Sequence, residues 1–241
     1  PYVFLMTALG SAVVTPLLGS RPIAAFQFDF VWFAYIWALG RIAVMLAALD
    51  TGSAFEGMGA AREATFSTLI EPALFLVTGA FSLLSGTHTL YEAVESHLPA
   101  GAGTVAWVCG VVALLIVLQV ETARMPIDDP TTHLELTMVH EVMVLDHSGP
   151  ELAAIQVGSA IKLLVGSSIV ATLLNPWSGS GGALSAALNV LLCGIIAGLI
   201  GTIESLIARL KLRTVPQYLV VALASGIVAL LATMWRVGVA P

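Results

Sequence analysis

Residues 120–149 read VETARMPIDDPTTHLELTMVHEVMVLDHSG and gather carboxylates directly behind an apolar run. No charge occurs in residues 103–119, whereas acidic side chains recur at short intervals in the quoted stretch. Hydrocarbon does not tolerate such a density of charge, because an ionised group at the bilayer centre costs about 2.5 to 3.5 kcal/mol on insertion scales. The stretch is therefore predicted to face water, a protein partner or a functional site.

On either side of this stretch, the chain has the composition of an integral membrane protein. Of its 241 residues, 58% are hydrophobic and only 10% are charged, compared with roughly 25% charged residues in a soluble domain. Uncharged runs recur at about the 20 residues that a helix needs to cross a bilayer. We predict one all-α membrane domain, residues 1–241, with about seven transmembrane helices at 2–19, 29–49, 65–86, 103–123, 151–174, 184–207 and 217–238. Because the chain begins at Pro1 without a charged leader, we expect a further helix upstream.

The basic residues predict the orientation of these helices. They concentrate in the loops 50–64, 124–150 and 208–216, which the positive-inside rule places in the cytoplasm. The same loops hold much of the acidic charge behind the net charge of −6, so we expect them to form a docking face for a soluble partner. An acidic face excludes nucleic acid as that partner. The residues predicted for this face are Asp50, Glu56 and Glu63, together with Asp129 and Asp146 of the quoted stretch.

Local signals divide the quoted stretch into two parts. Pro126 and Pro130 are expected to end the preceding helix, because proline removes a backbone donor and restricts the residue before it. Thr132 followed by Glu135 has the spacing of a capping box. We therefore predict that a second helix begins there and runs through residues 134–145.

Metal and redox centres are not predicted in this chain. Cys109 and Cys193 lie in apolar segments without a CxxC pattern, and they are interpreted as small core residues. His133, His140 and His147 are spaced by seven, which separates them by about 10.5 Å on a helix, too far to share one ion. Any redox cofactor must then lie in another subunit.

Ionisable residues at membrane depth are the candidate functional residues. Each should be paired or face a hydrated cavity, because lipid cannot solvate it. A proton relay or a charged cavity lining is the functional interpretation. The alternative is a set of static pairs, such as Lys162 with Glu71, or Glu121 with Arg124 at a helix end. The residues concerned are Arg41, Glu71, Glu121, Lys162 and Glu204.

Several separated motifs resemble one family of membrane subunits. They are LDTGSAFEGMGA at 49–60, REATFSTLIE at 62–71, ETARMPIDDPTTHLEL at 121–136, DHSG at 146–149 and ARLKLRTVP at 208–216. They resemble the NADH dehydrogenase subunit 1 family, which complex I shares with energy-converting hydrogenases of the formate-hydrogenlyase type. Residues 129–133 replace a run of glutamates found in the complex I members. That departure favours the hydrogenase branch over a quinone-reducing one.

The resemblance implies a membrane anchor that couples electron transfer to proton or sodium translocation in a prokaryotic cytoplasmic membrane. Its implied partners are hydrogenase-type large and small subunits, a ferredoxin-like iron–sulfur subunit and antiporter-like membrane subunits, with the iron–sulfur clusters and any NiFe centre held by those partners. The family has eight helices, one more than predicted here. A quinone-site subunit and a stand-alone ion-coupled transporter remain alternatives. The implied coupling acids are Glu71, Glu121, Asp128, Glu135 and Glu141, with Arg62 and Arg124 as their electrostatic partners.

Overall fold

The computed structural model describes residues 1–239 apart from 96–100, 125–126, 129–137, 181 and 207–213. All regular elements in the described part are helices, which confirms the predicted all-α class. Its elements are α1 (Tyr2–Val14), α2 (Asp29–Asp50), α3 (Ala54–Ser85), α4 (Leu90–Glu95), α5 (Ala102–Glu121), α6 (His140–Met143), α7 (Gly149–Leu174), α8 (Ala183–Leu206) and α9 (Val215–Val239).

The predicted number of about seven membrane helices is confirmed by six long apolar helices and one shorter one. Helices α2, α3, α5, α7, α8 and α9 are long and apolar enough to cross a membrane. Helix α1 has 13 residues, which gives about 20 Å at 1.5 Å per residue. It ends before the predicted residue 19, because Thr15 precedes Pro16 and takes an extended conformation, with φ −100° and ψ 148°.

Helix α3 replaces most of the loop predicted at residues 50–64. It begins at Ala54 and has 32 residues, a length of about 48 Å, whereas the hydrocarbon core is about 30 Å thick. Its first turns therefore extend past the hydrocarbon, which explains how a charged sequence can remain helical there. Pro72 lies inside the helix and does not end it.

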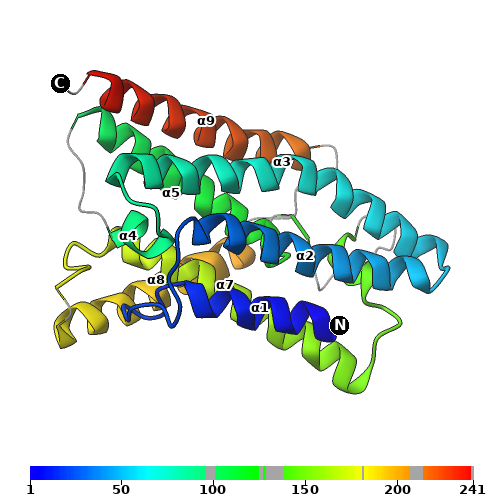
Figure 1. Ribbon diagram of the computed structural model, residues 1–241. Helices are drawn as coiled ribbons and strands as arrows, with labels where there is room; N and C mark the ends of the chain where they lie inside the picture. The colour runs from blue at the N-terminus through cyan, green and yellow to red at the C-terminus, as the bar shows by residue number, and fades with distance from the viewer. Residues whose placement is uncertain (96–100, 125–126, 129–137, 181, 207–213, 240–241) are drawn as a thin grey trace.

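The long helices pack as a bundle around α5 and α7 (Figure 1). In the most apolar window of α5 and of α7, 61% of the residues are buried, compared with 28% for α8 and α9. The outer faces of α8 and α9 are thus left for lipid or another subunit. One end of the bundle brings together the end of α2 with the starts of α3 and α7, and α5 ends further inside, level with Lys162 in the middle of α7 (Figure 1). We call it the acidic end, because the exposed residues Asp50, at the end of α2, and Asp146, before the start of α7, lie there.

Backbone hydrogen bonds define the turn that ends α5. The amide of Arg124 donates to the carbonyl of Gln119 at 2.9 Å, and that of Ala123 donates to Val120 at 3.0 Å. These two bonds form a Schellman motif, which requires a left-handed residue in the position of Ala123. Ala123 adopts φ 51° there. The turn leaves Glu121 pointing into the bundle and directs the chain away from it.

Asp128 fixes the start of α6 and corrects the predicted helix at 134–145. Its buried carboxylate accepts backbone amides of Val139, at 3.2 Å, and His140, at 2.6 Å. Met138 and Val139 are not helical, so the helix begins at His140 and ends at Met143. The carboxylate of Asp128, which precedes α6 by 12 residues, thus accepts the backbone amides at the start of that helix. The proposed capping box of Thr132 and Glu135 lies outside the described residues.

A buried charge network at the acidic end

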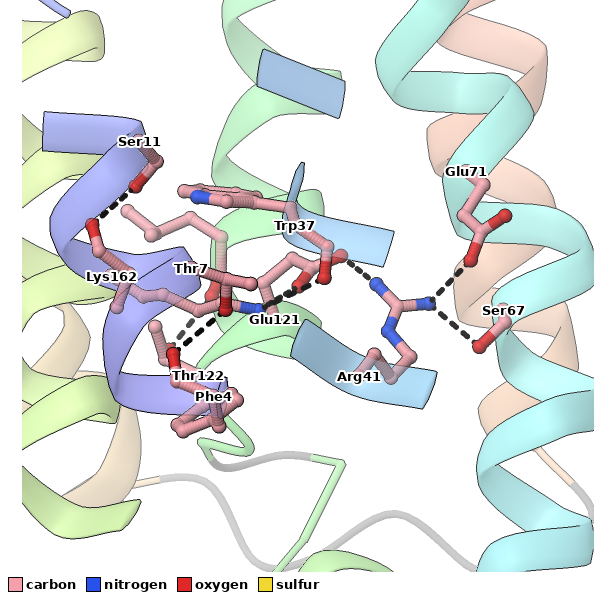
Figure 2. Close-up of polar contacts among 12 residues, drawn as sticks. Phe4, Thr7, Ser11, Trp37, Arg41, Ser67, Glu71, Glu121, Thr122 and Lys162 are labelled. Carbon is pink, nitrogen blue, oxygen red and sulfur yellow. Dashed lines mark hydrogen bonds and ion pairs between the residues drawn. The ribbon is translucent and has the colours of Figure 1, made fainter. Parts of the chain in front are cut away.

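Three polar residues on α3 face one arginine on α2. Glu63, Ser67 and Glu71 are spaced by four and lie on one helical face. Arg41 extends toward this face: its Nε lies 3.3 Å from Glu63, and its Nη1 lies 2.7 Å from the Ser67 hydroxyl and 3.7 Å from Glu71. Figure 2 shows the guanidinium between α2 and α3 in contact with Ser67 and Glu71. One cation therefore joins two carboxylates that are two helical turns apart.

Glu121, the last residue of α5, links this arginine to a lysine on α7. One carboxylate oxygen contacts Arg41, and the other lies 3.0 Å from the Lys162 ammonium (Figure 2). The ammonium also lies 3.5 Å from the carbonyl of Trp37, and 5.0 Å from the centroid of the Phe4 ring. Lys162 is therefore enclosed by one carboxylate, one carbonyl and aromatic faces, which stabilise a buried cation.

These residues form one network, hereafter the charge network. The side chains of Lys162, Glu121 and Arg41 are 1%, 2% and 5% exposed, whereas that of Glu71 is 38% exposed. Among the described residues, two cations face three carboxylates, so the formal charge of the network is 2 − 3 = −1 when all are ionised. Uptake of one proton makes the network neutral. It can therefore exchange a proton without leaving a larger unpaired charge inside the bundle.

Two cavities adjoin the network. A small cavity of about 20 Å³ is lined by four members of the charge network, Arg41, Glu63, Glu121 and Lys162, and by His140 among others. We call it the inner cavity; its volume admits about one water molecule. A larger, open cavity of about 200 Å³, hereafter the vestibule, lies beside it. The vestibule is lined by Thr122, Ala123, Arg124, His140, Glu141, Val144, Leu152, Ile155, Gln156 and Ser159.

The network contains four of the five predicted ionisable membrane residues, but the two suggested pairings are wrong. Lys162 pairs with Glu121 and not with Glu71, because Arg41 lies between α2 and α3 and contacts Glu71 instead. Arg124 pairs with Glu204 of α8, at 3.4 Å, and not with Glu121. The left-handed turn at Ala123 separates Arg124 from Glu121, which removes the i,i+3 geometry of a continuing helix.

The remaining implied coupling residues lie around the network. Asp128 holds the start of α6, and Glu141 lines the vestibule. Arg62 donates to the carbonyl of Met138 at 2.8 Å and so connects α3 to the segment before α6. Glu135 lies outside the described residues. Their implied coupling roles stay predictions.

The predicted docking face loses two of its acids. Glu56 is 1% exposed and Glu63 belongs to the charge network, because both lie on buried faces of α3 and not in a loop. Asp50 and Asp146 are exposed at the acidic end. Asp129 lies outside the described residues. The role of this end in docking stays a prediction.

Three contributors were not predicted from sequence. Glu63 was assigned to a loop, and Ser67 and Trp37 carried no prediction, although all three contact the cations. The spacing of Glu63, Ser67 and Glu71 was an available signal, because polar residues four apart share a helical face. Within the described residues, no group of three His, Cys, Asp or Glu side chains is placed to hold a metal ion.

Comparisons with known proteins agree on a family. A family model described as NADH dehydrogenase matches residues 1–235. Hydrogenase-4 component C of Escherichia coli K12 is 30% identical over 201 residues, which are 83% of this chain and 62% of that protein. Formate hydrogenlyase subunit 4 of the same organism is 26% identical over 230 residues, 90% of this chain and 72% of that protein. The chain thus spans less than two thirds of the length of the first relative.

The fold also matches a solved structure. The membrane-bound sulfane sulfur reductase, an archaeal respiratory membrane complex, contains a chain that superposes with a TM-score of 0.70 and 19% identity, covering 97% of this chain and 80% of that one. At that identity the match supports the fold alone. Six long apolar helices and the family model covering residues 1–235 lead to one assignment. This chain is a multi-pass membrane protein that belongs to the NADH dehydrogenase family, which includes the corresponding membrane subunit of complex I.

Proposed function

We propose that this chain is the membrane anchor and coupling subunit of a complex I-like energy-converting hydrogenase of the formate-hydrogenlyase type, in a prokaryotic cytoplasmic membrane. Its similarity to hydrogenase-4 component C and to formate hydrogenlyase subunit 4 supports this class of complex. The large, small and ferredoxin-like iron–sulfur subunits dock at the acidic end. These partners hold the clusters and the NiFe centre, and antiporter-like subunits lie beside the bundle in the membrane.

The observation that carries the proposal is the buried charge network with one carboxylate in excess. A static pair needs equal numbers of cations and anions, whereas this network has two and three. The excess carboxylate allows one proton to bind at little electrostatic cost. Coupling then follows from charge: a reduced cluster or a bound anion near the acidic end disfavours the ionised carboxylates and promotes proton uptake, and oxidation promotes release.

The contacts of the network also run from the buried interior toward the surface, which suits coupling to a neighbouring subunit. It begins at Lys162, which is fully enclosed, and passes through Glu121 and Arg41 to Glu71, whose side chain is more than a third exposed (Figure 2). Glu71 is therefore the network member closest to the outer surface of α3. In the proposed complex, an antiporter-like subunit receives the proton or its electrostatic effect at this residue.

Replacement of Glu121 by Gln tests the coupling role. Gln keeps the shape of the side chain but binds no proton, and two carboxylates then balance two cations. We expect the Glu121→Gln complex to assemble and to evolve hydrogen in the presence of an uncoupler within about twofold of wild type. Proton uptake by inverted membrane vesicles should fall at least about tenfold, as for loss of an essential proton-transfer group.

Glu204→Gln is the matched control, because Glu204 pairs with Arg124 outside the network and both side chains are partly exposed. It should leave proton uptake unchanged. Loss of assembly in Glu121→Gln would instead assign the network to holding helices together.

Purification through a tag on this chain tests the class of complex. Nickel with hydrogen evolution supports the proposal, whereas quinone reduction without nickel, or a chain that purifies alone, contradicts it.

A further inference from the structure

The vestibule and the inner cavity have two lining residues in common, His140 and Ala123. The vestibule is open and about 200 Å³ in volume, whereas the inner cavity is about 20 Å³ and is lined by four charged side chains of the network. Ala123 contributes only a methyl group to the boundary. Among the described residues that line both cavities, His140 is therefore the one whose side chain carries exchangeable protons.

The backbone fixes His140 in this position. Its amide donates to the buried Asp128 carboxylate at 2.6 Å, and it is the first residue of α6. Val139 before it and Val142 and Met143 after it are buried, so the chain is anchored on both sides of His140. The backbone of His140 is consequently held at the boundary by a cap that the sequence places 12 residues earlier.

Both cavities that His140 lines contain other polar residues. Arg124 and Glu141 line the vestibule with Gln156 and Ser159, and they suit ordered water. The inner cavity presents Glu63 and Glu121, the carboxylates closest to the buried cations. An imidazole between water and carboxylates can bind a proton on one ring nitrogen and release another from the second nitrogen.

We propose that His140 is the residue through which protons pass from the vestibule into the charge network. A proton from vestibule water binds one ring nitrogen of His140, and the other nitrogen releases its proton to water in the inner cavity. That water delivers the proton to Glu121 or Glu63, and rotation of the ring restores the starting tautomer. The inference rests on the proposed coupling function and assigns its point of proton entry.

Chemical rescue of a His140 variant tests the transfer step. In the intact complex in inverted vesicles, His140→Ala should lower the rate of proton uptake at least about tenfold while uncoupled hydrogen evolution stays within about twofold. Added imidazole at millimolar concentration should restore much of the lost rate, because it fits the vacated space. His140→Leu should show the same defect without rescue, because the leucine side chain fills that space.

His147→Ala is the matched control. His147 lies on the same segment and pairs with Glu151 at 3.4 Å, but it lines neither cavity. It should keep the wild-type rate with and without imidazole. If His140→Ala takes up protons at the wild-type rate, or loses uptake without any rescue, the inference is overturned. If Glu121→Gln also takes up protons normally, the proposed function itself fails.

Hydration of the vestibule is tested separately from coupling. In a Cys109→Ala and Cys193→Ala background, Ser159→Cys places a thiol in the vestibule, and Val157→Cys places one at a similar depth on the outer, 51% exposed face of α7. A charged, membrane-impermeant thiosulfonate should modify Ser159→Cys at least about tenfold faster, because it reacts with the thiolate, which forms in water. Equal rates would overturn the inference.

Discussion

Two buried polar regions, at different depths of the bundle, connect its helices by different chemistry. In the described part of the chain, the charge network contains five ionisable residues, whereas a neutral polar cluster lies along α7 and α8 toward the end of α7. Its members hydrogen-bond over 2.5 to 3.3 Å, and they are Ser168, Thr172, Asn175, Ser185 and Asn189. Along α7, the neutral cluster extends from about 9 Å beyond Lys162, at Ser168, to about 20 Å beyond it, at Asn175.

The neutral cluster satisfies its polar groups locally. The Asn175 amide nitrogen donates to the carbonyl and hydroxyl of Ser185, at 3.0 and 3.3 Å, and its oxygen accepts the amide of Trp177 at 3.0 Å. Ser168 donates to the carbonyl of Pro16 at 2.5 Å. These hydrogen bonds join α7, α8 and the segment after α1 without any charge. Neutral groups are thus sufficient to hold helices together in this bundle.

Compared with the neutral cluster, the charge network joins helices at a higher cost in desolvation free energy. Desolvation of buried ions often exceeds their mutual attraction, and apolar replacements of whole ion networks can be neutral or stabilising. A region that retains five ionisable groups beside two cavities is therefore better explained by charge movement than by packing alone. Three substitutions probe this difference between the regions.

Arg41→Leu should have the largest effect on stability. It removes the cation shared by Glu63, Glu71 and Glu121 and leaves only Lys162 beside three carboxylates. Breaking a buried ionic network by removing one partner costs about 3 to 5 kcal/mol. We expect a marked loss of folded protein in detergent, measured by the apparent unfolding temperature. Glu121→Gln should cost much less, and equal losses would contradict the charge balance described here.

Asn175→Ala should have an intermediate effect confined to stability. It removes three hydrogen bonds and leaves buried partners in α8 unsatisfied, at a cost of about 1 to 3 kcal/mol. The apparent unfolding temperature should fall, while the ratio of protons taken up to hydrogen evolved stays at the wild-type value. A changed ratio would show that the two regions do not differ in function.

Arg124→Gln should have the smallest effect. Its pair with Glu204 is 3.4 Å long, and the two side chains are 38% and 26% exposed. Partly exposed pairs contribute about 0 to 1 kcal/mol, because water and salt screen them. The unfolding temperature should change little, and any difference should vanish in high salt. A fall in the unfolding temperature as large as that of Arg41→Leu would mean that burial does not distinguish the Arg124–Glu204 pair from the ion pairs of Arg41.

Local sequence signals were enough to predict the class of fold and the positions of most helices. Spans at 29–49, 103–123, 151–174, 184–207 and 217–238 correspond to α2, α5, α7, α8 and α9 within a few residues. Apolar runs determine these helices, because a backbone in lipid must satisfy its own hydrogen bonds. The charged start of α3 was predicted as a loop, because few apolar residues occur there. The structure shows that the helix nevertheless begins at Ala54.

The sequence by itself also placed Arg41, Glu71, Glu121 and Lys162 inside the membrane domain, because few charges interrupt the apolar runs. It could not decide which of them pair, since α2, α3, α5 and α7 meet only after packing. The turn at Ala123 and the Asp128 cap separate Glu121 from Arg124 and bring His140 to the inner cavity. Contacts between residues 26 to 80 positions apart, such as those of Arg41 with Ser67 and of Arg124 with Glu204, depend on helix packing, and no local sequence pattern encodes them.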